Sequence, residues 1–139
     1  MGIPFFSDEW IAAYKTAINS NAAYKTAAAD WIYGVVALIC KAQPPAFPGD
    51  VGIWLDLDRG VCREAKAVSI AEAMKAPFCI TAEYARWKQV LRKELEPIKG
   101  MMQGKLRLKG DLPTIVRAVQ AAQELVNSAA KLDTKFIDE

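Results

Sequence analysis

Residues 100–111 read G-M-M-Q-G-K-L-R-L-K-G-D, and the two glycines before a lysine invite comparison with a phosphate-binding loop. Such a loop needs four residues between its glycines, and a serine or threonine after the lysine whose hydroxyl holds magnesium. Here only three residues separate Gly100 from Gly104, and Leu106 occupies the hydroxyl position. The segment therefore does not predict a nucleotide site.

The second half of this segment has the pattern of a strand that leads into a helix. Residues 105–109 alternate between charged and apolar side chains, which is the period of a strand with one buried face. Gly104 and Gly110 bound that strand. The next residues, 111–113, place an aspartate before a leucine and a proline, which predicts the first turn of a helix. The apolar stripe of this last helix consists of Leu112, Ile115, Val116, Val119, Ala122, Leu125 and Val126.

The middle of the chain is rich in strand signals. Aliphatic and aromatic content, or strict alternation, predicts strands at 31–41, 51–57, 61–68 and 77–80. Between the second and third of these, Asp58-Arg59-Gly60 predicts a hairpin turn, because glycine adopts positive φ without strain.

Short helices are expected before and after these strands. Ser7 precedes the first, and Asn19-Ser20-Asn21 separates it from a second that repeats the hexamer A-A-Y-K-T-A. A third helix is expected with Thr81 as its cap, and a fourth after Pro97. Residues 69–76 fit either a short helix or an irregular edge.

This order of elements predicts an α+β fold with a single, largely antiparallel, five-stranded sheet covered on one face by helices. A chain of 139 residues is expected to form one domain over 1–139 and to bury about two thirds of its unfolded surface. A net charge of +2 excludes nucleic acid as the expected partner, because phosphate binding needs a dense basic stripe.

The titratable residues restrict the chemistry further. There is no histidine, which excludes imidazole bases and imidazole metal sites, and no cluster has metal-ligand spacing, so neither a metal nor another cofactor is expected. Cys40, Cys62 and Cys79 are odd in number and lie in apolar runs, which predicts buried free thiols in a reducing compartment. The sequence shows neither a secretory signal nor an apolar run long enough to span a bilayer, so a cytoplasmic location is expected.

Three stretches of the chain resemble the sterol carrier protein type two domain family. They are T-A-E-Y-A-R-W-K-Q-V-L at 81–91, E-P-I-K-G-M-M-Q-G-K-L-R-L-K-G-D-L at 96–112, and the hairpin W-L-D-L-D-R-G-V-C at 54–62. The strongest motif is M-x-G-K-L-x-L-x-G-D, from Met102 to Asp111. The resemblance implies a non-catalytic carrier with an apolar tunnel between sheet and helices, which takes fatty acids, fatty acyl-CoA, isoprenoids or sterol-like lipids.

Apolar residues near this motif are the candidates for the tunnel wall. Methionine adapts its shape to different ligands, which suits Met101 and Met102 to that role, although both could equally fill core. The tryptophans are more typical of core packing than of binding. The full set of candidate tunnel residues is Trp54, Trp87, Met101, Met102, Leu112, Ile115, Val116 and Val119.

Basic residues gather in the same part of the chain. Residues 83–111 hold eight Lys or Arg against four acidic residues. Such an excess attracts an anionic membrane surface, although a solvated face has the same composition. The hypothesised membrane-facing patch consists of Arg86, Lys88, Arg92, Lys93 and Lys99.

Two other functions remain open at this level. The fold could serve as a scaffold that holds a partner from a lipid or quinone pathway. Asp56 and Asp58 could form a carboxylate pair in an enzyme, but carboxylates beside a hairpin turn are mostly solvated. No feature of the sequence predicts the oligomeric state.

Overall fold

The computed structural model describes residues 2–43 and 49–136. Its helices are α1 (Asp8–Asn19), α2 (Ala22–Ala27), α3 (Ile70–Ala73), α4 (Tyr84–Leu91), α5 (Pro97–Met102), α6 (Leu112–Arg117) and α7 (Val119–Ala130). Its strands are β1 (Ile3–Pro4), β2 (Val36–Lys41), β3 (Val51–Asp58), β4 (Val61–Val68), β5 (Phe78–Glu83), β6 (Arg107–Lys109) and β7 (Thr134–Lys135).

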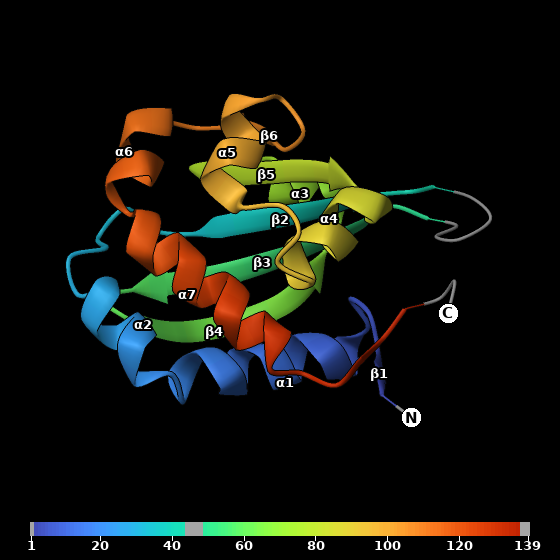
Figure 1. Ribbon diagram of the computed structural model, residues 1–139, viewed down its shortest axis with the longest axis horizontal. Coiled ribbons are helices and arrows are strands. Elements are labelled where there is room, and N and C mark those ends of the chain that lie inside the picture. Colours follow the sequence, from blue (N-terminus) through green and yellow to red (C-terminus); the bar gives the residue numbers. More distant parts are fainter. Residues whose placement is uncertain (1, 44–48, 137–139) are drawn as a thin grey trace.

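Five strands form one sheet in the order β4-β3-β2-β5-β6, which confirms the predicted α+β fold (Figure 1). Only the central pair β2–β5 is parallel, and the other three pairs are antiparallel. The sheet is therefore largely antiparallel, as the hairpin at Asp58-Arg59-Gly60 indicated.

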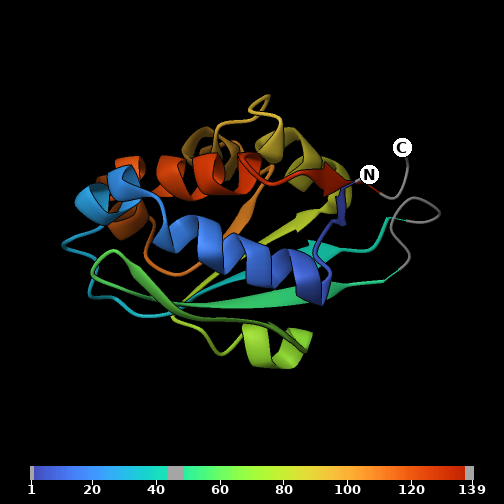
Figure 2. The same ribbon diagram turned by 90° about the horizontal axis from the view of Figure 1, so that it is seen from below.

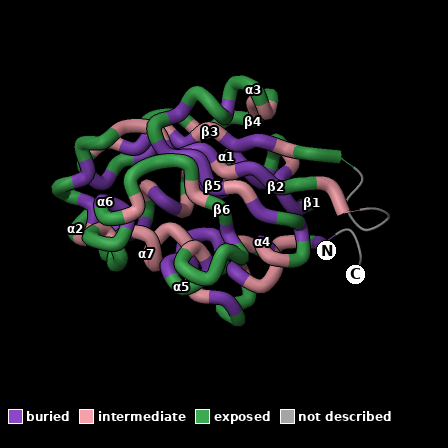
Figure 3. Tube along the Cα trace, turned by 90° about the horizontal axis from the view of Figure 1, so that it is seen from above, coloured by how far each residue is buried: buried purple, intermediate pink, exposed green. Residues whose placement is uncertain are grey.

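The helices cover one face of the sheet, with one exception. Figure 2 shows the sheet almost edge-on, with α3 below it and the other helices above. The main core lies under the upper helices, whereas a second, small cluster of Ala37, Ile39, Ala73, Ala76 and Cys79 lies beneath α3. Figure 3 colours the chain by burial and shows that parts of α3 are exposed, whereas β3 beside it is largely buried. The undecided segment 69–76 thus contributes a helix that shields the opposite face.

A second sheet, which the sequence did not indicate, joins the two ends of the described chain. β1 and β7 pair in parallel, and Phe5 N donates to Lys135 O at 3.0 Å. Each strand has two residues, too few to show a period.

Four predicted boundaries were wrong. Strand β2 begins at Val36, because the backbone turns at Gly34, where φ is +91°. Thr81 lies inside β5 and caps nothing; α4 starts after Glu83, and Gln43 Oε1 accepts from Ala85 N at 2.9 Å. Strand β6 has only three residues, since Lys105 N and Leu106 N both donate to Gly100 O in the turn after α5.

The fourth boundary concerns the last helix, which is two helices. At Ala118 the backbone leaves the helical region (φ −99°, ψ 29°), and Ala118 N donates to Ile115 O, a bond one residue shorter than the i→i−4 bond of an α-helix. The side chains after this break are therefore rotated relative to those before it, so the predicted single apolar stripe does not exist.

The predicted break at Asn19-Ser20-Asn21 is confirmed, and both asparagines anchor the helices to other elements. Asn19 Nδ2 donates to Cys62 O at 2.9 Å and its Oδ1 accepts from Cys62 N at 2.8 Å, which fixes α1 to β4. Asn21 Oδ1 caps α2 by accepting from Tyr24 N, and its Nδ2 donates to Ser128 Oγ on α7 at 3.0 Å.

Candidate functional site

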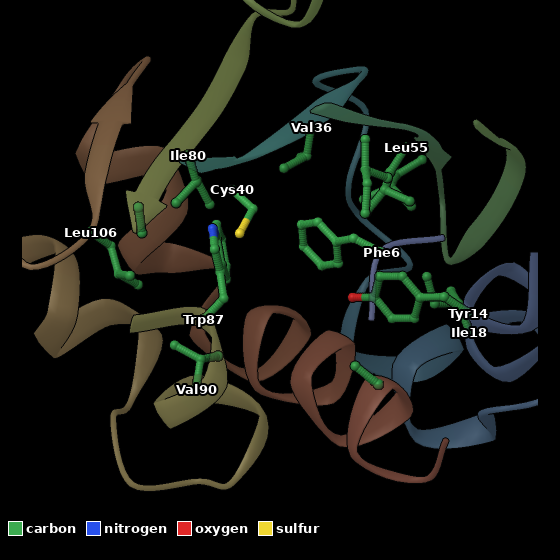
Figure 4. Packing of buried hydrophobic residues seen from close by; sticks show 14 of the residues in the cluster. Phe6, Tyr14, Ile18, Val36, Cys40, Leu55, Ile80, Trp87, Val90 and Leu106 are labelled. Atoms are coloured by element: carbon green, nitrogen blue, oxygen red, sulfur yellow. The ribbon is translucent and has the colours of Figure 1, made fainter. Parts of the chain in front are cut away.

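An apolar hollow of about 90 Å³ lies between the sheet and the helices above it. Its floor consists of side chains from β2, β3 and β5, among them Val36, Leu55 and Ile80 (Figure 4). Trp87 and Val90 of α4 face these residues from the helix side. Helices α5 to α7 add Met101, Ile115, Ala118, Ala121 and Ala122 to the lining, and Tyr14 of α1 and Tyr24 of α2 also border the hollow.

The exposure of Leu38 shows the same gap in the core. It lies on β2, the central strand, between Ile53 of β3 and Ile80 of β5, and it points toward the helices. A residue in that position is normally fully buried, because strands flank it on two sides and helices cover it. Leu38 is only half-buried, which means that the helices above it do not cover it completely.

A second, smaller hollow of about 40 Å³ continues from the first toward the N-terminal segment. Tyr14, Leu38, Trp87, Val90 and Val126 border both. The second hollow ends against Phe5 and Phe6. The two spaces are therefore neighbours that share part of their lining.

Among the described residues that line the larger hollow, none carries a charge. Three of its polar side chains make hydrogen bonds: Tyr14 Oη donates to Leu125 O at 3.0 Å, Trp87 Nε1 to Ile39 O at 2.8 Å, and Trp31 Nε1 to Gly34 O at 2.9 Å. Burial raises the pKa of both Tyr14 and Tyr24, so neither is an anion at neutral pH. The described lining of the hollow therefore suits an apolar molecule.

The structure brings only some of the predicted tunnel residues together. Trp87, Met101 and Ile115 line the hollow. Trp54 lies on the opposite face of the sheet, where it packs against the cluster beneath α3. Leu112 is half-buried outside the hollow, and the exposed fractions of Met102, Val116 and Val119 are 69%, 40% and 40%.

The sequence analysis missed Tyr14, Val36, Leu38 and the α7 alanines. Residues 36–40 are apolar throughout, so alternation could not tell which side chains face the helices. The alanines at 121 and 122 are small enough to leave the hollow open, but nothing in the sequence distinguishes them from alanines that pack closely.

The hypothesised membrane-facing patch is spread over two helices and a turn. Arg86, Lys88 and Arg92 belong to α4 or its end, Lys93 follows at φ +61°, and Lys99 lies on α5. Lys88 Nζ and the Arg92 guanidinium lie 5.2 and 5.1 Å from the centroid of the Phe136 ring. These two cations therefore pack against the C-terminal segment through cation–π contacts.

The other candidate chemistry is not assembled into a site. Asp56 pairs with Arg63 at 3.0 Å on the outer surface, and Asp58 lies near Arg59 and Arg63 at 3.7 and 3.9 Å. The three cysteines are buried and unpaired, as predicted. Across residues 2–43 and 49–136 no group of His, Cys, Asp or Glu could hold a metal ion, and no helix is long and apolar enough to cross a membrane.

Comparison with known proteins gives consistent matches. The model of the SCP-2 sterol transfer family matches residues 14–123. A crystal structure of sterol carrier protein 2 is 40% identical and superimposes with a TM-score of 0.83, covering 92% of this chain and 98% of its own. A solution structure from Thermus thermophilus, described as possibly a sterol carrier protein, is 38% identical with a TM-score of 0.83, covering 96% and 95%.

A more distant structure shares the fold alone. It is described as a UbiJ-SCP2 ubiquinone synthesis protein, is 17% identical, and has a TM-score of 0.53 over 92% of this chain and 93% of its own. No curated protein matches the chain.

Proposed function

This chain belongs to the SCP-2 sterol transfer family, and we propose that it binds a lipid in the hollow between sheet and helices and carries it without chemical change. The family is known for lipid binding and transfer and is generally non-catalytic. Fatty acids, fatty acyl-CoA, isoprenoids and sterol-like molecules are the ligand classes that we propose. Three buried, unpaired thiols support the proposal of a reducing, cytoplasmic location.

The observation that carries this proposal is the uncharged hollow beneath α7, together with the incomplete burial of Leu38 at its floor. Protein cores are close packed, and an unfilled apolar space costs stability. Such a space in the centre of the core is expected where a ligand replaces the missing contacts.

The hollow must enlarge to hold a lipid. A cavity of about 150 Å³ binds a molecule as small as benzene, whereas the larger hollow measures about 90 Å³. The α6–α7 junction is the element best suited to move, because α7 has no side-chain cap and Ala118 interrupts the helix. Met101 adds a flexible side chain at the same place.

The energetics favour exchange with a membrane over permanent retention. Burying one methylene contributes about 0.8 kcal/mol, so a sixteen-carbon chain gains at most about 13 kcal/mol on leaving water. A bilayer offers the same chain a similar gain. A carrier therefore needs only to match the bilayer in affinity.

The proposal is tested by native mass spectrometry of the freshly purified chain, followed by extraction and identification of what it holds. We expect an added mass that corresponds to a lipid. The variant Ala122→Trp, whose indole fills the hollow, should lose this mass, and Ala12→Trp, on the exposed side of α1, should keep it.

A bare wild-type mass that stays bare after incubation with fatty acid and acyl-CoA would contradict lipid carriage. It would favour the scaffold alternative, for which stable copurification with a partner is the readout. Turnover of an acyl-CoA that is lost in the double variant Asp56→Asn, Asp58→Asn would instead favour an enzyme.

A further inference from the structure

In three pairs of consecutive residues, the first residue lines the hollow and the second is exposed on the surface. Met101, Ile115 and Ala118 line the hollow. The residues that directly follow them, Met102, Val116 and Val119, are among the most exposed large apolar side chains of the described chain. We call these three exposed residues the rim. They lie on α5, α6 and the first turn of α7, so exposed apolar surface directly adjoins the lining.

Apart from Leu38 of β2, the half-buried residues of the lining come from this part of the chain. Met101, Ala118 and Ala122 are half-buried, whereas Trp87 and Val90 of α4 are buried. Figure 1 shows α6 and α5 on one side of α7, the helix that crosses the layer above the sheet. The hollow therefore approaches the surface at α5, α6 and α7, where the rim lies.

Positive charge is concentrated in this segment. Residues 97–123 contain five basic residues and one acidic residue, whereas the whole chain has a net charge of only +2. Lys99, Lys105, Arg107 and Arg117 are exposed. The one acid, Asp111, accepts a hydrogen bond from Thr114 Oγ1 at 2.5 Å. Of these cations, Lys99 lies on α5 three residues before Met102, and Arg117 directly follows Val116 on α6. Arg107 and Lys109 lie on β6 opposite Thr81 and Cys79, on the face of the sheet toward α3, where Lys109 Nζ donates to Met74 O at 2.7 Å. An anionic surface that approaches the rim therefore meets Lys99 and Arg117.

We propose that the rim of Met102, Val116 and Val119, with the basic residues beside it, docks on an anionic lipid bilayer. Apolar side chains that enter the headgroup region, together with cations that meet acidic headgroups, are the two requirements for reversible membrane docking. The inference rests on the proposed function and adds the route: lipid passes at the α6–α7 junction between hollow and bilayer without crossing water.

This assignment differs from the patch on α4 and α5 that the sequence suggested. Two cations of that patch, Lys88 and Arg92, pack on the ring of Phe136. Among the described residues, none of the exposed large apolar side chains lies on α4. The rim combines charge with exposed apolar surface, and α4 does not.

The test is cosedimentation of the full chain with vesicles of phosphatidylcholine alone, or of phosphatidylcholine and phosphatidylserine in about a 2:1 ratio. We expect wild type to bind the anionic vesicles preferentially. The double variant Val116→Glu, Val119→Glu should bind them about tenfold less, because it removes apolar contact and opposes the surface charge. The control is Val61→Glu, since Val61 is 42% exposed, as the rim valines are, but lies on the β3–β4 hairpin.

Thermal unfolding checks that each variant is folded. If the double variant fails to fold, Met102→Glu replaces it, with the exposed Met74 giving the matched control Met74→Glu. Three results would contradict the proposed docking surface. They are equal binding of wild type and rim variants to anionic vesicles, an equal loss of binding in the control variants, and equal binding of wild type to both kinds of vesicle. The proposal of lipid carriage is tested separately, because it is contradicted by a wild-type mass without bound lipid in the native mass spectrometry experiment, which uses no vesicles.

Discussion

Leu38 and Ile53 are register partners across β2 and β3 and point to the same face of the sheet, yet only Ile53 is completely buried. Ile53 lines neither hollow, whereas Leu38 borders both. Two adjacent aliphatic side chains thus mark the boundary between close-packed core and the space assigned to a ligand.

This boundary predicts unequal costs of truncation. Ile53→Ala should destabilise by about 4 kcal/mol, whereas Leu38→Ala should cost about 2 kcal/mol because part of the leucine already faces empty space. Urea denaturation of both variants measures the difference. Equal costs would mean that the core above Leu38 is as well packed as that around Ile53.

Tyr14 ties α1 to α7 across the hollow, through its hydrogen bond to Leu125 O. Tyr14→Phe removes this bond and should lower stability by about 1 kcal/mol. It should also speed the exchange of a fluorescent fatty acid, because α7 loses a restraint. Tyr33→Phe is the matched control, since Tyr33 is 48% exposed. An unchanged exchange rate would show that α7 does not limit ligand entry.

The sheet was predictable because its signals are local. Alternation in 51–58 indicated β3, and the glycine at 60 indicated the hairpin. The same alternation places Trp54 with Asp56 and Asp58, on the side opposite Ile53, Leu55 and Leu57. Trp54 was nevertheless included among the candidate tunnel residues, although tryptophans are more typical of packing, and in the structure it packs against the cluster beneath α3.

The site was less predictable because tertiary packing decides it. No glycine or proline marks the break at Ala118, which separates the exposed Val116 from the exposed Val119. The periodicity of apolar residues likewise cannot show that the helices lie far enough from Leu38 to leave a hollow. The family resemblance supplied the site's general location, and the individual lining residues required the structure.

Gly60 should be intolerant of substitution for two separable reasons. Its φ is +87°, and a Cβ there would lie 2.8 Å from Lys25 O on α2. Gly104 has a similar φ of +76°, but a Cβ added there would have no atom within 4 Å. Gly104→Ala should therefore lower stability by about 1 kcal/mol through the backbone conformation alone. Gly60→Ala should lower stability by clearly more, because the added methyl group also meets Lys25 O. Thermal unfolding compares them, and equal losses would show that the hairpin yields to the added methyl.

Cys62 should make stability fall at alkaline pH. Burial raises the pKa of its thiol from 9.0 to about 11. Between pH 9 and 11 the unfolded thiol loses its proton while the folded thiol keeps it, so deprotonation favours the unfolded state. The contribution is fully present below pH 9 and declines as pH rises toward 11.

Other buried groups also titrate at high pH, so the effect of Cys62 must be measured as a difference. The quantity is the difference in unfolding free energy between wild type and Cys62→Ala, from urea curves at about pH 8, 9, 10 and 11. This difference should be constant below pH 9 and shift against the wild type above it. A difference that stays flat to pH 11 would show that the folded thiol titrates as freely as the unfolded one, and that the packing of β4 against α1 admits solvent.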